Sequence, residues 1–261
     1  MAPTVPDILA KIVSQKRSDL AEARTRVAAL EQLAEQRISE RRDFRGALTT
    51  SQPAVISEIK KASPSKGLLA PDFNPAETAR VYERGGAAAL SVLTDETFFQ
   101  GSLADLETAR SAVSIPALRK DFTLDEFHIV EAAAHGADAI LLIVAILDPR
   151  LLRRLRECAA QWNLAVLVEV HDADELSAAI ECGAEIIGVN NRNLHTFEVT
   201  LETSIRLAEK IPAPVVKVSE SGIHSAADVR RLSASGYQAF LVGEHLMKSG
   251  NPEQALRNLR A

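Results

Sequence analysis

The sequence predicts a (β/α)₈ barrel with a helical N-terminal extension, and three observations support this fold class. Eight short apolar runs alternate with longer amphipathic runs along most of the chain. The short runs are almost continuously apolar, which is typical of parallel strands buried on both faces. The chain has 261 residues, a common length for such a barrel. An open doubly wound sheet is the main alternative, but no G-x-G-x-x-G motif follows the first run.

The first part of the chain is predicted to be helical. Between about Pro6 and Phe44 the apolar residues recur with helical spacing, as Ile8, Ile12 and Val13 do. Apolar β-branched runs begin only after this segment. We therefore expect residues 1–48 to form a helical extension packed on the barrel, and residues 49–261 to form a single barrel domain.

The predicted strands follow in order. They are Ala54–Lys60, Ala88–Asp95, Ile115–Phe122, Ala137–Leu147, Leu164–His171, Ala184–Asn191, Pro214–Gly222 and Gln238–Glu244. The segments between them include Pro75–Arg84, Asp148–Gln161 and Ala226–Ala234, which we expect to be helices. Several of these segments end in glycine, a common stop signal for a helix.

The composition excludes several classes of protein. Hydrophobic residues make up 46% of the chain and charged residues 25%, as in ordinary soluble proteins. The net charge of −5 gives no support for nucleic-acid binding, and no apolar run suits a signal peptide or a membrane span. Cys158 and Cys182 lack the spacing of a zinc site or redox pair. We expect a cytoplasmic protein, and a monomer is the simplest oligomeric state.

Polar side chains gather at the carboxyl ends of the predicted strands, where the active sites of (β/α)₈ barrels lie. A charge at the end of an apolar strand needs a partner, because removing an unpaired charge from water is costly. The barrel would bring these groups together at one mouth. They are Glu58, Lys60, Lys120, Asp121, Glu169, Asn190, Asn191, Arg192, Ser219, Glu220 and Ser221.

The end of the first predicted strand carries Glu58, Lys60 and Lys61. Side chains along a strand alternate between its two faces, so Glu58 and Lys60 share one face and Lys61 points the other way. We expect Glu58 and Lys60 to serve the function of the site. The structural alternative is a salt bridge that only fixes the geometry of the mouth.

Lys120 and Glu169 are candidates for an acid and a base. Nearby cations and an apolar wall can lower the pKa of a lysine, so Lys120 is a candidate general acid, or a nucleophile that forms a Schiff base. Its structural alternative is an ion pair with Asp121 or Asp95. Glu169 is a lone carboxylate within the run LVEV and must be paired or protonated. It is either a general base or the partner of a lysine.

The last two strands suggest a phosphate site. Gly222 follows the seventh strand and Gly243 the eighth, and barrels often bind phosphate with these two loops. The alternative is that both glycines only permit tight turns. Phe99 and Phe122 lie near strand ends and either line an aromatic pocket or fill loops. The histidines show no H-x-x-x-H spacing, so we expect no metal site.

The ordered set of strand-end motifs closely resembles the indole-3-glycerol phosphate synthase family. The resemblance covers nearly the whole chain from about Val55 onward, and the N-terminal extension is also similar to that of the family. It implies conversion of 1-(2-carboxyphenylamino)-1-deoxyribulose 5-phosphate to indole-3-glycerol phosphate, with release of CO₂ and water and without a metal or organic cofactor. The motifs are EIKKASPSKG, SVLTDETFFQGS, LRKDF, LVEVH, GVNNRNL, SESGI and FLVGE.

The resemblance also implies roles for individual residues. Lys120 would be the general acid that assists ring closure, and Glu169 the general base in the dehydration. Glu58 and Asn190 would orient groups around the reacting centre, and Lys60 would meet the carboxylate or phosphate of the substrate. Around the substrate it places Ser63, Pro64, Phe99, Phe122, Arg192, Leu194, Glu220 and Ser221, with Gly222, Gly243 and Glu244 beside the phosphate.

One residue departs from the family pattern, and two other functions stay open. His245 follows GE where many relatives carry serine, which could make phosphate binding depend more on pH. An aldolase that forms a Schiff base on Lys120 is one alternative. A barrel that binds a phosphorylated ligand without catalysis is the other, although Lys120 and Glu169 together argue against it. The sister isomerase of the pathway is disfavoured, because no cysteine ends the first strand.

Overall fold

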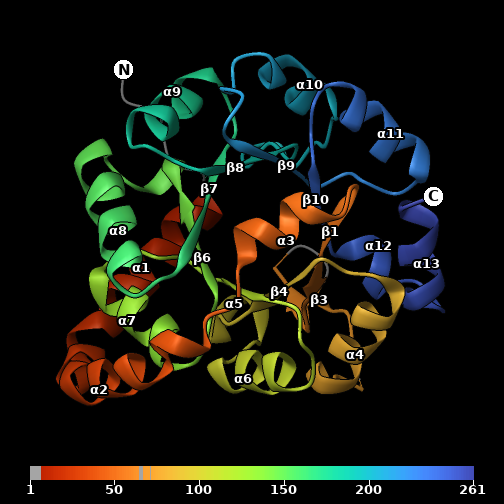
Figure 1. Ribbon diagram of the computed structural model, residues 1–261. Helices are drawn as coiled ribbons and strands as arrows, with labels where there is room; N and C mark the ends of the chain where they lie inside the picture. Colours follow the sequence, from red (N-terminus) through yellow and green to blue (C-terminus); the bar gives the residue numbers. More distant parts are fainter. Residues whose placement is uncertain (1–6, 65–66, 71) are drawn as a thin grey trace.

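The computed structural model describes residues 7–64, 67–70 and 72–261 and shows a closed parallel barrel (Figure 1). Around the barrel the strands pair in the order β1-β10-β9-β8-β7-β6-β5-β4. The predicted (β/α)₈ fold is therefore confirmed, and each predicted strand contains an observed one. The strands are β1 Ala54–Ile59, β4 Ala89–Leu93, β5 Ala117–Lys120, β6 Ala139–Ile143, β7 Ala165–Val170, β8 Ile186–Asn190, β9 Val216–Glu220 and β10 Ala239–Val242.

A ring of helices covers the outside of the barrel (Figure 1). Its members are α4 Pro75–Gly85, α6 Leu103–Ser111, α7 Glu126–Ala134, α8 Pro149–Gln161, α9 Ala173–Glu181, α10 Glu202–Ala208, α11 Ala226–Ala234 and α13 Pro252–Leu259. Side chains cap most of their N-termini; Asp148 of α8, for example, accepts from the N–H groups of Arg150 and Leu151. The positive φ of Gly183 and Gly236, 80° and 93°, follows the helix-ending pattern expected from the sequence.

Two apolar layers hold the barrel together. Residues that point outward from the strands, such as Val55 and Leu90, pack against the helices. Residues that point inward, such as Ile56, Leu118 and Leu167, fill the interior. Alternation along each strand separates the two sets, so the near-continuous apolar runs in the sequence reflect burial on both sides.

Several short elements at the strand ends were not predicted. A two-stranded hairpin, β2 Ala62–Ser63 and β3 Gly67–Leu68, follows β1. Short helices follow three other strands: α5 Glu96–Phe99, η3 Val144–Ile146 and α12 Glu244–Met247. All of them belong to loops at the carboxyl ends of the strands, where they help to shape the mouth of the barrel.

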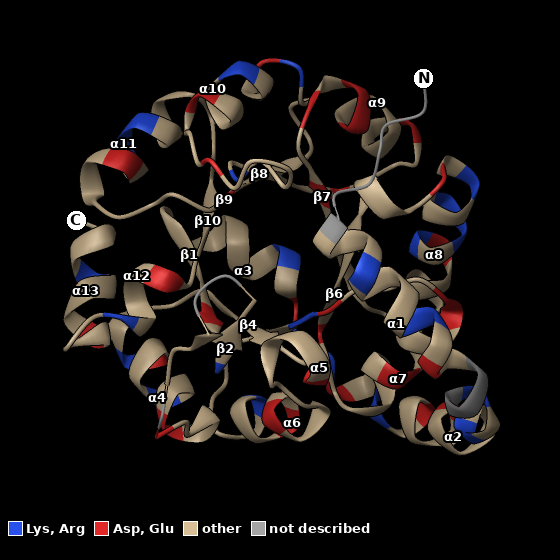
Figure 2. Ribbon diagram, turned by 180° about the vertical axis from the view of Figure 1, so that it is seen from behind, with Lys and Arg blue, Asp and Glu red and all other residues tan. Residues whose placement is uncertain are grey.

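The N-terminal extension reaches both ends of the barrel. It comprises α1 Asp7–Ala23, η1 Arg24–Arg26, α2 Val27–Arg37 and η2 Ile38–Glu40, so the predicted helical start at Pro6 lies outside the described residues. Helix α2 packs on α7. The next helix, α3 Phe44–Thr50, lies over the centre of the barrel in Figure 1 and buries two apolar side chains in the interior. On the opposite side, Figure 2 shows α1 in front of the barrel beside β6.

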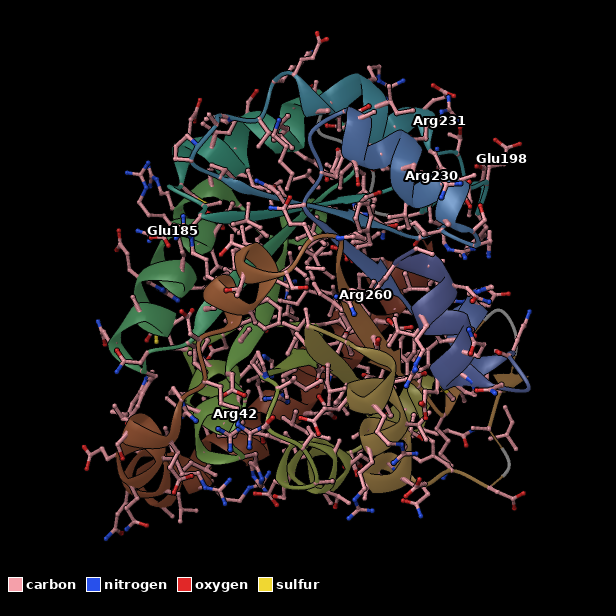
Figure 3. The ribbon with its side chains drawn as sticks, turned by 45° about the vertical axis from the view of Figure 1, so that its right-hand side comes forward. Arg42, Glu185, Glu198, Arg230, Arg231 and Arg260 are labelled. Carbon is pink, nitrogen blue, oxygen red and sulfur yellow. The ribbon has the colours of Figure 1, made fainter. Side chains whose placement is uncertain are left out.

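A buried carboxylate joins the extension to the barrel. Asp138 accepts hydrogen bonds from the Arg110 guanidinium at 2.9 and 3.0 Å and from the backbone N–H groups of Arg42 and Ala117. The Arg42 side chain, labelled in Figure 3, donates to the carbonyl oxygen of Ile115 at 2.7 Å. These bonds fix the chain that leaves η2, while the domain boundary after residue 48 stays a prediction. No helix in the described part of the chain is long and apolar enough to cross a membrane.

Candidate active site

Two adjoining cavities lie at the carboxyl ends of the strands. The first has a volume of about 220 Å³ and is partly lined by Ile8, Leu9 and Ile12 of α1, which sequence analysis did not assign to the site. Predicted residues form most of the rest of its wall. They are Glu58, Lys60, Ser63, Pro64, Phe99, Lys120, Phe122, Glu169, Asn190, Arg192, Leu194 and Glu244.

The second cavity, of about 330 Å³, lies over the ends of β9 and β10. It shares Glu58, Lys60 and Lys120 with the first cavity. The structure therefore brings the residues expected to touch the substrate to one of these two spaces, although residues 65 and 66 of the first motif lie outside the described residues. The expectation that Asn191 and Ser219 join them was wrong, because these two buried side chains bond to each other and Ser219 to Ser204 of α10. The remaining predicted residues of this cavity are Glu220, Ser221, Gly222 and Gly243.

Lys120 lies among carboxylates, and this overturns one expectation. Its Nζ atom is 3.1 Å from Oε2 of Glu169 and 3.9 Å from Oε2 of Glu220. Burial alone would lower the pKa of Lys120, but Glu169, Glu220 and Glu58 raise it above its ordinary value. The expected lowered pKa was wrong, because acidic residues from three other strands surround this amine. The ion pair proposed with Asp121 or Asp95 is replaced by one with Glu169.

Glu169 has donors on both oxygens. Besides Lys120, Asn190 donates to Oε1 at 3.2 Å, and Nε2 of His171 lies 3.4 Å from the same oxygen. Glu169 is only 3% exposed, and burial would raise its pKa. The positive charges of Lys120 and His171 hold that pKa well below its ordinary value. The buried carboxylate is therefore ionised, as a base requires.

The pKa of Glu220 shifts in the opposite direction. It is buried at the end of β9, and burial followed by repulsion from Glu169 raises its pKa. Within the described residues, no donor reaches Oε1 of Glu220. Two neighbouring carboxylates with opposite pKa shifts are a common arrangement at sites that transfer protons.

Glu58 and Lys60 form an ion pair on the same face of the chain that leaves β1. Strand alternation correctly predicted that these two side chains meet. Glu58 also lies against Gly243 at the end of β10, where a Cβ atom would overlap its carboxylate. The close approach of Glu58 therefore requires a glycine at position 243.

A further lysine of the extension reaches the site. Lys16 of α1 pairs with Asp121 at 2.6 Å and with Asp95 at 3.3 Å. Asp121 follows Lys120 directly and is also bound by Arg119 at 3.0 Å. Sequence reasoning missed Lys16, because its helical spacing places it on α1 but does not show what α1 covers.

The loop after β9 has an unusual backbone. Ser221 and Gly222 are both left-handed, with φ of 67° and 78°, and strain at a residue such as Ser221 is frequent at functional sites. The rings of His224 and His245 meet edge to face at 6.0 Å beside this loop. Burial, followed by the neighbouring His224, lowers the pKa of His245.

Aromatic and apolar groups shape the first cavity. Phe99 and Phe122 lie 6.1 Å apart, measured between ring centroids, on neighbouring loops. Phe197 also lines the cavity but was not predicted, because it lies in a polar loop rather than at a strand end. Among the described residues no cluster of His, Cys, Asp or Glu could hold a metal ion.

Comparison with known proteins agrees with this geometry. The family model described as "Indole-3-glycerol phosphate synthase" matches residues 9–259. The chain belongs to the indole-3-glycerol phosphate synthase family. The family member from Koribacter versatilis is 52% identical over 256 residues, covering 96% of this chain and 98% of its own. The member from Albidiferax ferrireducens is 50% identical over 261 residues, covering 98% of each chain.

Solved structures outside the family share the fold. A thiamine phosphate pyrophosphorylase from Pyrococcus furiosus matches with a TM-score of 0.62 and 19% identity, over 84% of this chain and 96% of its own. A mandelate oxidase mutant matches with a TM-score of 0.63 and 19% identity, over 80% of this chain and 71% of its own. At this identity the likeness concerns the barrel alone, which serves many chemistries.

Proposed function

We propose that this chain is an indole-3-glycerol phosphate synthase, a carboxy-lyase of tryptophan biosynthesis. It closes the ring of 1-(2-carboxyphenylamino)-1-deoxyribulose 5-phosphate, releases CO₂ and then water, and leaves indole-3-glycerol phosphate. The observation that carries the proposal is the contact between Lys120 and Glu169, 3.1 Å apart at the junction of an apolar cavity and a glycine-lined one. It suits a substrate with an aromatic ring at one end and a phosphate at the other.

The two cavities suit the two ends of the substrate. The aromatic ring lies in the first cavity against Phe99 and Phe122, with Pro64 and Leu194 completing the apolar contact. The phosphate lies in the second cavity, toward Gly222 and the other residues after β9 and β10. Lys60 lines both cavities, so its ammonium neutralises an anionic group of the substrate at either end.

Protonated Lys120 and ionised Glu169 are the proton donor and the proton acceptor of the reaction. Attack of the aromatic ring on the substrate carbonyl turns the carbonyl oxygen into an alkoxide, which Lys120 protonates. Loss of CO₂ then restores aromaticity. Lys120, reprotonated from solvent, then protonates the departing hydroxyl so that it leaves as water, while Glu169 removes a proton from the neighbouring carbon. Glu58 and Asn190 orient the reacting groups, since each is held by a bond to a charged partner.

The raised pKa of Lys120 suits this role and disfavours an aldolase. Schiff-base formation needs a neutral amine, whereas Glu169, Glu220 and Glu58 keep Lys120 protonated. A lysine held in its charged form carries a proton that it can donate, and an alkoxide is basic enough to take that proton. We further propose that the chain works as a cytoplasmic monomer on a small phosphorylated substrate, without metal, organic cofactor, nucleic acid or membrane.

Fluorescence detection of indole-3-glycerol phosphate tests the proposal. We would assay wild type, Lys120→Ala and the control Lys61→Ala, which lines neither cavity. We expect product from wild type and the control, and a loss of at least about a hundredfold in Lys120→Ala. Similar rates in all three would retain the reaction but move the acid to Lys60. No product from folded wild type would refute the proposed function.

A further inference from the structure

Two histidines line the second cavity beside the ends of β9 and β10. His245 lies in the first turn of α12, two residues after Gly243, and is half-buried. His224 lies in the loop between β9 and α11 and is exposed. Their rings meet edge to face, with centroids 6.0 Å apart. The two imidazoles therefore lie where the phosphate group of the proposed substrate is expected, although the proposed function gives them no role.

The phosphate needs positive charge that the other side chains of this cavity do not freely supply. Each permanent cation of its wall already faces a carboxylate of the barrel mouth, so its charge is partly neutralised before a dianion enters. Neither imidazole forms an ion pair with a carboxylate in the part of the chain that the structure describes. An imidazole that takes up a proton would therefore add charge that no carboxylate cancels directly. The cations and their partners are Lys60 with Glu58, Lys120 with Glu169 and Glu220, and Arg192 with Glu244.

His245 is mainly uncharged at neutral pH before any ligand binds. Burial, followed by the neighbouring His224, lowers its pKa below the ordinary value of a histidine, and Asp228 opposes this without reversing it. Asp228 is already engaged by the loop, because its Oδ2 atom accepts from the backbone N–H groups of His224 and Ser225 at 3.0 and 2.9 Å. The ring of His245 thus has a free lone pair on one nitrogen, which can take a proton.

The remaining charged groups near His245 belong to its own helix and to β9. Lys248 pairs with Glu244 at 2.6 Å, so these two charges of α12 largely offset each other. Glu220 of β9 lines the same cavity, and its pKa is raised by burial and by repulsion from Glu169. Glu220 therefore also gains a proton as the pH falls, and a test has to read His245 separately from it.

We propose that His245 binds the phosphate group of the substrate directly and takes up one proton from solvent as the dianion enters, an inference that rests on the proposed function and deepens it. The lone pair of the neutral ring binds this proton, and the new N–H bond donates to a phosphate oxygen. The site thereby gains positive charge when an anion fills it. When the anion leaves, the imidazolium returns the proton to solvent.

The proposal fixes the direction in which affinity changes with pH. A bound dianion raises the pKa of His245 above that of the free chain, since it stabilises the imidazolium. Affinity for a dianion must then rise as the pH falls from the pKa of the bound form to that of the free form. Above this interval the imidazole stays neutral in both forms, and below it the imidazole is charged in both, so His245 adds no further pH dependence there.

Nuclear magnetic resonance of the histidine side chains tests this in the intact wild-type chain. The imidazole of His245 would be titrated from about pH 5 to 9, first without ligand and then with saturating sulfate. Sulfate is a tetrahedral dianion whose charge stays constant over this range. His245→Gln identifies the resonance of His245, and His195, which lines a different cavity, is the internal control. Isothermal titration calorimetry of sulfate would compare wild type, His245→Gln and the matched control His195→Gln.

We expect sulfate to raise the proton affinity of His245 about tenfold, because a charge-assisted hydrogen bond is about twice as strong as a neutral one. His195 should not respond. At about pH 5.5 His245→Gln should bind sulfate about tenfold more weakly than wild type, whereas His195→Gln should bind it equally well.

Sulfate that binds without changing the titration of His245 would overturn the inference, as would a wild type that binds no sulfate. The wild-type titration decides even if His245→Gln does not fold. Product formation by the same wild type separates the two proposals. An active enzyme with an unresponsive His245 refutes the proton uptake alone, whereas an inactive one refutes the proposed function and this inference with it.

Discussion

Replacing Lys16 by methionine tests whether the N-terminal helix completes the substrate cavity. Lys16 is the residue of α1 that pairs with Asp121 and Asp95, whose side chains are only 4% and 3% exposed. Three apolar residues of the same helix line the first cavity. Methionine keeps much of the aliphatic stem and removes the charge, so the change isolates the ion pairs from the packing of α1.

The distances and burial of these ion pairs determine how much stability Lys16→Met should lose. A charge pair near 3 Å is worth roughly 5 kcal/mol at an effective dielectric constant of about 20, before desolvation is subtracted. Removing one partner of a buried pair typically costs about 3–5 kcal/mol. Lys16 is 15% exposed and Asp121 keeps its bond to Arg119, so the lower end, about 3 kcal/mol, is the better figure. For a chain of this size that corresponds to a fall in Tm of about 6–12 °C.

Lys11→Met is the matched control, because Lys11 lies exposed on the same helix. Thermal unfolding gives Tm, and steady-state kinetics with the carboxyphenylamino-deoxyribulose phosphate gives KM. We expect Lys16→Met to lower Tm as calculated and to raise KM about tenfold, equivalent to about 1.4 kcal/mol. If Lys16→Met and Lys11→Met have the same Tm and KM, the inference that α1 is held over the site by these ion pairs is wrong.

Three further changes test other parts of the structure. Asp138→Ala leaves the Arg110 guanidinium without its buried partner and should lower the free energy of unfolding by about 3–5 kcal/mol in urea titration; a loss below about 1 kcal/mol would contradict this. Gly243→Ala should displace Glu58 and reduce kcat about tenfold to a hundredfold, and unchanged kinetics in a folded variant would disprove the close approach. The raised pKa of His171, about 10 in the folded chain, contributes stability that is complete below about pH 6.5 and is lost as pH rises through 10. Wild type should therefore lose more stability than His171→Gln between pH 7 and 10, and parallel curves would refute the assignment.

The barrel was predictable because its signals are local. Strand β7 is a run of apolar residues interrupted by one carboxylate, and such a run indicates burial on both faces without any knowledge of its neighbours. Helix ends are also local, as the left-handed glycines at 183 and 236 illustrate. The short hairpin after β1 and the helix α5 were missed, since two to four residues carry too little periodicity to be recognised.

The site was predictable only where strand geometry alone decides it. Alternation places Glu58 and Lys60 on one face, and their ion pair follows. The pKa of Lys120 depends instead on carboxylates from β1, β7 and β9, which the sequence around Lys120 does not contain. The ion pairs of Lys16 have the same origin, because they join residues that are about eighty and one hundred positions apart in the chain. Long-range packing sets the pKa of Lys120 and the ion pairs of Lys16, so local sequence could predict neither of them.

Two glycines show how the charged cluster constrains the rest of the barrel. In sequence terms Gly188 weakens an otherwise apolar strand, and Gly243 suggests only a turn or a phosphate contact. In the structure, a Cβ atom at Gly188 would overlap the Glu220 carboxylate, and one at Gly243 would overlap that of Glu58. Each glycine thus leaves room for a buried carboxylate on a neighbouring strand. Because Gly243 also lines the second cavity, a side chain at this position would displace Glu58, one of the carboxylates that raise the pKa of Lys120.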